Sequence, residues 1–82
     1  MPEGPKLALL KRRGFIYDFR RMIYYNPRVR KVFSAEAVED HDLRWIYARL
    51  REPPRTSWTF YFNDPPSADV RGELIRYLSG VQ

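Results

Sequence analysis

Residues 56–62 read Thr-Ser-Trp-Thr-Phe-Tyr-Phe, and this stretch decides the fold class. Large aromatic side chains alternate with smaller or polar ones, and a period of two is typical of a β-strand with two different faces. Trp58, Phe60 and Phe62 share one face, which we expect to be buried. A strand is not stable alone, so this one needs a partner. Three partners are open to it: residues 28–33, the short apolar run Leu7–Leu10, or the same strand of a second chain.

Helices are predicted on both sides of this strand. Before it, a helical stretch over 35–51 has Ser34 as N-cap and ends before Pro53-Pro54. Glu39 would interrupt its apolar stripe, so we predict a break at 39–42, with Asp40 or Asp42 capping a second helix. The stripe of that second helix is Leu43, Ile46, Tyr47 and Leu50.

A last helix follows the turn after the strand. Ser67 is its predicted N-cap, and Gly80 lies just past its end. Its apolar stripe is Val70, Leu74, Tyr77 and Leu78.

Residues 15–25 fit two periodicities. As a strand, alternate positions would carry Phe15, Tyr17, Phe19, Arg21, Ile23 and Tyr25 on one face. As a helix, the strongly apolar residues fall within an arc of about 120°, and Asp18, Arg20 and Arg21 lie outside it. Gly14 and Asn26-Pro27 would bound this helix. We predict the helix.

The whole chain of 82 residues has room for one domain, 1–82, with residues 1–5 as a loose tail. The predicted fold is α+β: a short sheet with two to three helices packed on its aromatic face.

Composition excludes several classes of protein. No cysteine is present, so disulfides and thiolate chemistry are absent. The apolar run Leu7–Leu10 is too short for a signal peptide or a membrane span, so we expect a cytoplasmic protein without a membrane partner.

Residue types that carry catalysis are scattered along the chain. His41 is the only histidine, and no ligand is placed three or four residues away from it. The acidic run 39–42 fits a solvated turn or cap. We therefore expect no metal, no cofactor and no enzymatic activity.

Basic residues are concentrated at the start of the sequence. The net charge is +5, and residues 1–33 contain nine basic groups against two acidic ones. Arginine binds phosphate, and tyrosine stacks on bases. The sequence therefore favours a non-catalytic interaction module that binds the phosphate backbone of nucleic acid. The candidate site residues are Arg12, Arg13, Tyr17, Arg20, Arg21, Tyr24, Arg28, Arg30 and Lys31.

Two alternatives remain open. The chain could be a protein–protein adaptor or small homodimer that uses the aromatic strand or the Arg/Tyr face of the predicted helix 15–25. It could also be a winged helix-turn-helix, with Arg44 and Arg51 facing outward and strand 56–62 beginning the wing. The acidic run 39–42 argues against the second alternative, because it would lie close to phosphates.

Overall fold

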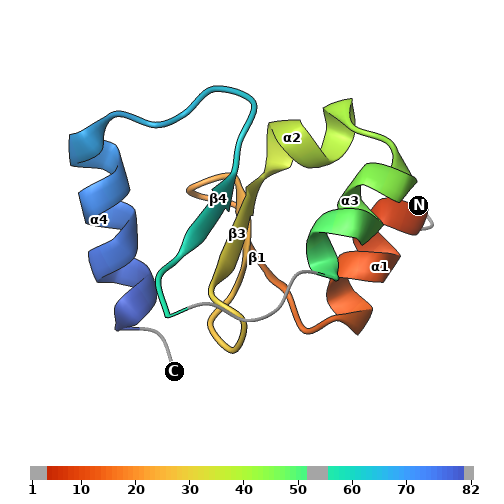
Figure 1. Ribbon diagram of the computed structural model, residues 1–82, viewed down its shortest axis with the longest axis horizontal. Helices are drawn as coiled ribbons and strands as arrows, with labels where there is room; N and C mark the ends of the chain where they lie inside the picture. The colour runs from red at the N-terminus through yellow and green to blue at the C-terminus, as the bar shows by residue number, and fades with distance from the viewer. Residues whose placement is uncertain (1–3, 52–55, 81–82) are drawn as a thin grey trace.

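The strand predicted over 56–62 is present as β4 (Thr59–Tyr61), and its partner is β3 (Lys31–Ser34). The two strands are parallel, with Val32 opposite Phe60. Of the three partners that the sequence left open, the segment 28–33 therefore supplies the pairing strand. The structure is a computed structural model that describes residues 4–51 and 56–80 (Figure 1), so Pro53-Pro54 lies outside the described residues.

Four strands form one mixed sheet in the order β1-β2-β3-β4. β1 (Ile16–Asp18) and β2 (Ile23–Asn26) are antiparallel, as are β2 and β3. A parallel pair needs a crossover, and helices α2 (Ala35–Asp40) and α3 (Leu43–Leu50) lie in the β3–β4 connection. The predicted α+β class is confirmed, because four helices accompany this sheet.

The helix ends follow the predicted caps. Ser34, Asp42 and Ser67 each accept a hydrogen bond from the backbone N–H three residues ahead, at 3.0, 2.8 and 3.3 Å. They begin α2, α3 and α4 (Ala68–Ser79), and Gly80 ends α4. The break between α2 and α3 is thus set by Asp42. Helix α1 (Pro5–Arg12) begins inside the predicted tail, whose residues 1–3 are outside the described part.

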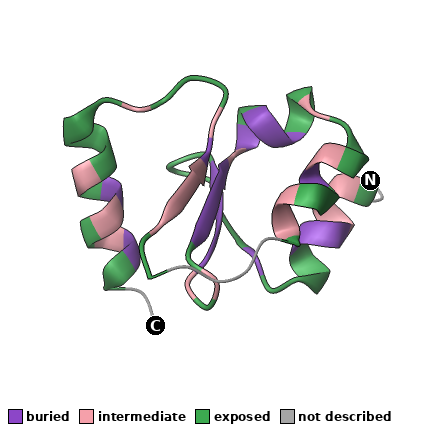
Figure 2. Cartoon of the chain, viewed as in Figure 1, coloured by how far each residue is buried: buried purple, intermediate pink, exposed green. Residues whose placement is uncertain are grey.

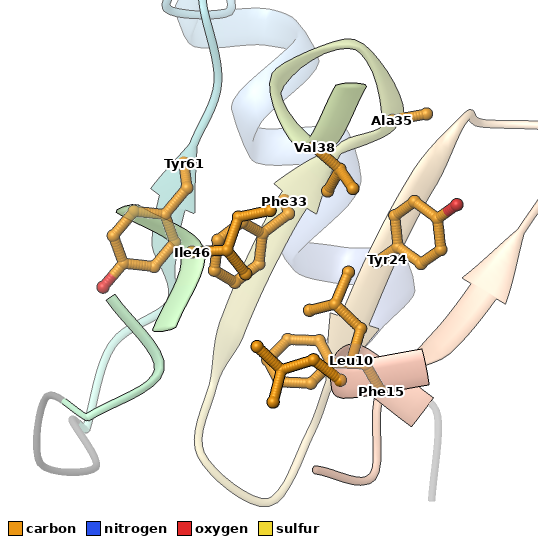
Figure 3. Packing of buried hydrophobic residues seen from close by; sticks show 9 residues of the cluster. Leu10, Phe15, Tyr24, Phe33, Ala35, Val38, Ile46 and Tyr61 are labelled. Atoms are coloured by element: carbon orange, nitrogen blue, oxygen red, sulfur yellow. The ribbon is translucent and has the colours of Figure 1, made fainter. Parts of the chain in front are cut away.

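Helices cover both faces of the sheet. α1, α2 and α3 lie on one side and α4 on the other (Figure 1). Phe33 is the centre of the three-helix side and is fully buried; the rings of Phe15 and Tyr61 lie beside it, at 5.5 and 4.6 Å between centroids (Figure 3). The ring of Trp45 also contacts Phe33, at 6.2 Å between centroids.

The opposite side has a smaller core. Val32, Leu74 and Leu78 are buried there, and the predicted face of Trp58, Phe60 and Phe62 packs against them half-buried. That face therefore carries the single helix α4, while the other three helices cover the face of Phe33.

The helix predicted for residues 15–25 is wrong. These residues form a hairpin in which Tyr17 is opposite Tyr24 and a four-residue turn, 19–22, joins the strands. All four residues of β2 are buried, because the strand is covered on both faces. A helix could bury only one arc of the same residues. Tertiary packing therefore decides between the two periodicities.

A candidate nucleic-acid interface

Six arginines from three separate elements lie at one end of the sheet, which we call the basic end. The strands impose this grouping, since β2 turns into β3 there and α1 enters β1 from the same side (Figure 1). The six are Arg12 and Arg13 at the end of α1, Arg28 and Arg30 in the β2–β3 turn, and Arg49 and Arg51 at the end of α3. All are exposed except Arg49, which is half-buried; Figure 2 shows this end of α1 as exposed.

Specific contacts hold the three elements together. The Asn26 side chain donates from Nδ2 to the Arg13 carbonyl oxygen at 2.9 Å, which ties β2 to the end of α1. A cavity of about 340 Å³ lies between the elements, and its lining includes Arg13, Arg28 and Leu50. Arg13 and Arg51 also approach the ring of Tyr47, at 5.4 and 5.9 Å from its centroid. The basic end is therefore one surface.

Acidic residues lie elsewhere in the described part of the chain. Segments 11–14, 26–31 and 47–51, as described, contain no aspartate or glutamate. In sequence, Glu52 follows directly, outside the described residues. A concentration of one charge sign raises the local concentration of oppositely charged ligands.

Lys31 lies beneath this surface. Only 1% of its area is exposed, and its Nζ donates to the Arg49 carbonyl oxygen at 2.7 Å. This contact joins β3 to the end of α3. Lys31 was predicted to contact the ligand directly; its burial instead makes it a support for the arginines above it, to which it adds positive charge.

Arg20 and Arg21 lie at the opposite end of the sheet, in turn 19–22. Arg21 pairs with Asp18, from Nη1 to Oδ2, at 3.0 Å, and its guanidinium lies 3.6 Å from the centroid of the Tyr77 ring. Burial alone would raise the pKa of the Asp18 carboxyl, but hydrogen bonds from Arg21, Tyr77 and Arg20 hold that pKa below its ordinary value. The Arg21 side chain therefore binds residues of its own chain, Asp18 and Tyr77.

Tyr17 and Tyr24 do not form an outward helical face. They are cross-strand neighbours, stacked with centroids 4.6 Å apart. Tyr24 is buried in the three-helix core, while Tyr17 is 42% exposed on the edge strand β1. The expected grouping of these tyrosines with Arg20 and Arg21 on one helix is therefore wrong, because the segment is a hairpin.

Sequence reasoning missed Tyr47 and Arg49 as parts of a site, and it named Arg51 only in the helix-turn-helix alternative. Residues 34–82 have more acidic than basic groups, which concealed the arginines at the end of α3. Tyr47 and Leu43 were assigned to the buried stripe, but both are exposed, and only Ile46 of that stripe is fully buried. Val70 of the last stripe is exposed as well. The signal that could have linked Tyr47 to Arg51 is their spacing of four residues on one helix.

The α2–α3 pair does not form a winged helix-turn-helix. β4 pairs in parallel with β3 as a strand of the main sheet, and the next described element is α4, so no wing hairpin forms there. Arg44 is exposed and lies 3.8 Å from Asp42. The winged helix-turn-helix alternative is therefore wrong, because strand 56–62 does not begin a wing.

His41 belongs to a polar contact at the far end of the sheet from the arginines. Its Nε2 lies 3.1 Å from Asn63 Oδ1, and its ring stacks on Trp45 at 3.9 Å. Within residues 4–51 and 56–80, no cluster of three histidine, cysteine, aspartate or glutamate side chains could hold a metal ion. None of the described helices combines the length and apolar character of a membrane span.

Comparison with known proteins gave no match to a family model, to a curated protein or to a solved structure.

Proposed function

We propose that the chain is a non-catalytic nucleic-acid-binding module that contacts the phosphate backbone through its basic end. The observation that carries the proposal is the convergence of six arginines from three described segments that contain no acidic residue. Guanidinium groups bind phosphate oxygens in pairs, and each neutralised phosphate releases counterions. Such contacts provide affinity without reading sequence.

The backbone beneath these arginines is well held, which favours binding. Asn26 accepts from the Arg28 backbone N–H at 2.9 Å, and the backbone of Arg30 bonds to Asn26 and to Thr59, both at 2.9 Å. The turn is therefore fixed before a ligand arrives, and less ordering is required on binding. The arginine side chains remain adaptable at its surface.

The test compares two double variants that remove the same charge. Arg28→Ala with Arg30→Ala removes two groups of the basic end, and Arg20→Ala with Arg71→Ala removes two exposed groups outside it. Binding to labelled DNA and RNA of mixed sequence is measured by fluorescence anisotropy between about 20 and about 300 mM salt. The first variant should lower the slope of log K against log salt by about 2 and weaken low-salt binding roughly tenfold.

The control variant should keep both the slope and the affinity of the unmodified protein. Equal losses in the two variants would mean that only net charge matters, which contradicts a defined interface. Binding weaker than about 100 μM at low salt would contradict the function itself, because non-specific binders reach that range.

A homodimer is the second candidate, favoured by the edge strand β1. Within the described sheet β1 pairs only with β2, and the exposed Ile16, Phe19 and Met22 lie on the same hairpin. An unpaired edge with apolar side chains is suited to adding the same strand of a second copy. Light scattering of the same protein after nuclease treatment separates the candidates: a salt-resistant dimer favours this one, and a monomer excludes it.

A further inference from the structure

Tyr47 is an exposed aromatic ring beside the basic end. It lies on the outer side of α3 and is 42% exposed. Arg51 follows it by one helical turn, and Arg13 reaches it from α1. A tyrosine between two arginines offers a flat surface to a base and cations to the adjoining phosphates.

The surface next to this ring is hollowed. A cavity of about 330 Å³ is lined by Leu43, Arg44, Tyr47, Ala48 and Arg51. It is an open depression along α3 with a mostly apolar lining that includes two arginines. This volume is within the range of small-molecule sites. Arg44 is paired with Asp42 only at 3.8 Å in an exposed position, so its guanidinium is weakly held.

The arginines at Tyr47 lie farther from the ring than the arginine at Tyr77. The Arg21 guanidinium carbon lies over the Tyr77 ring, 3.6 Å from its centroid, which is van der Waals contact distance. At Tyr47 the guanidinium carbons of Arg13 and Arg51 lie over the ring at longer distances, 5.4 and 5.9 Å from its centroid. Cation–π attraction still holds the arginines near the ring. Tyr47 is nevertheless 42% exposed, so part of its surface stays accessible beside the two arginines.

We propose that Tyr47 and its hollow receive an unstacked base, so that the protein prefers single-stranded nucleic acid to duplex. This inference rests on the proposed phosphate contacts of the basic end. A duplex hides the faces of its bases, whereas a single strand can turn one out onto an aromatic ring. Arg13 and Arg51 then lie beside the phosphates that flank the base.

The experiment uses the full chain and one sequence of about 15 nucleotides, as a single strand and as a duplex, in DNA and RNA versions. Tyr47→Ala and Tyr47→Gln remove the ring, and Tyr47→Phe keeps it. Tyr17→Ala is the matched control, because Tyr17 is 42% exposed like Tyr47 but lies on β1, away from α3. Circular dichroism confirms that each variant is folded.

We expect the ring-removing variants to lose about 5- to 150-fold in affinity for the single strand, as measured for one stacked base. Duplex affinity should stay within about twofold, and the salt slope should not change, because no charge is removed. Tyr47→Phe should restore single-strand binding. Tyr17→Ala should bind like the unmodified protein.

Equal affinity of the unmodified protein for single strand and duplex would overturn the inference, as would full single-strand affinity in Tyr47→Ala. If Arg28→Ala with Arg30→Ala still weakens binding in that case, the proposed function stands without base stacking. If the unmodified protein binds neither nucleic acid, both proposals fail together.

Discussion

Turn 19–22 joins β1 to β2, and turn 27–30 joins β2 to β3. The two turns have the same local structure and lie at opposite ends of the sheet. Each has four residues and contains two arginines. Each follows a residue whose side-chain oxygen accepts backbone N–H groups of the turn: Asp18 in the first and Asn26 in the second. Each ends on a residue with left-handed backbone, Met22 at φ 56° and Arg30 at φ 55°.

The turns differ in the charge of the residue before them. The Asp18 carboxylate binds Arg21 and places it on Tyr77, so the first turn uses an arginine within the fold. Asn26 is neutral, and its amide donates to the Arg13 carbonyl oxygen, which draws further basic residues toward the second turn. Neither Arg28 nor Arg30 forms an ion pair with a described residue. The negative charge of Asp18 thus makes Arg21 part of the fold, whereas the neutral Asn26 leaves the arginines of turn 27–30 available to a ligand.

Removing the Asn26 side chain should have the largest effect on stability. Asn26 is 4% exposed, and both ends of its amide are bonded. Asn26→Ala deletes two hydrogen bonds and leaves the Arg13 carbonyl oxygen without this donor. We expect the free energy of unfolding to fall by roughly 2–4 kcal/mol, measured by urea denaturation. Asn63→Ala is the matched control; Asn63 is exposed, and its loss should cost less than about 1 kcal/mol. Similar losses at both sites would mean that Asn26 does not hold α1 to the sheet.

Local sequence patterns account for much of the fold. Ser34, Asp42 and Ser67 act within their own helices, so their capping roles could be predicted without knowing the tertiary structure. The turn 19–22 could not be predicted, because its left-handed position is a methionine and no glycine marks it. Residues 15–25 then fit both periods, and only the burial of β2 on two faces decides between them.

The candidate site, too, could be predicted only where tertiary packing does not decide which residues are exposed. Arg12, Arg13, Arg28 and Arg30 were named as candidates because they lie in the basic segment 1–33, and all four are exposed. Lys31 and Tyr24 look equally available in the sequence, yet packing buries both. Arg49 and Arg51 reach the basic end only because α3 packs beside α1, a contact between segments distant in sequence.

Replacing Asp18 by asparagine should make the first turn chemically like the second. Asp18→Asn keeps an oxygen to accept from the Arg20 and Arg21 N–H groups but removes the ion pair. At about pH 7 we expect a loss of roughly 0.5–1.5 kcal/mol in the free energy of unfolding, because Arg21 is partly exposed.

The effect of Asp18→Asn should depend on pH. The native pKa of Asp18 lies below its ordinary value of 3.8. The carboxylate therefore stabilises the fold at pH above that value, and this contribution disappears as the pH falls through the native pKa. The difference between the two proteins should be constant above about pH 5 and should shrink toward about pH 2.5, measured by urea denaturation. A constant difference down to the lowest pH would show that the charge of Asp18 has no role.

The smallest expected effect on stability concerns the two residues with left-handed backbone, Met22 and Arg30. Their glycine variants should change stability equally but nucleic-acid binding differently. A side chain in this conformation costs about 1–2 kcal/mol, and glycine removes that cost but loses roughly 0.5–1 kcal/mol through the entropy of the unfolded chain. Met22→Gly and Arg30→Gly should therefore each stabilise the protein by about 0.5 kcal/mol, seen as a rise in Tm. The alanine variants keep the Cβ atom and should not stabilise. Arg30→Gly should also lower the salt slope of nucleic-acid binding by about 1, whereas Met22→Gly should leave it unchanged. Equal slopes in the two glycine variants would remove Arg30 from the interface, and stabilisation by alanine would show that backbone strain is not the cause.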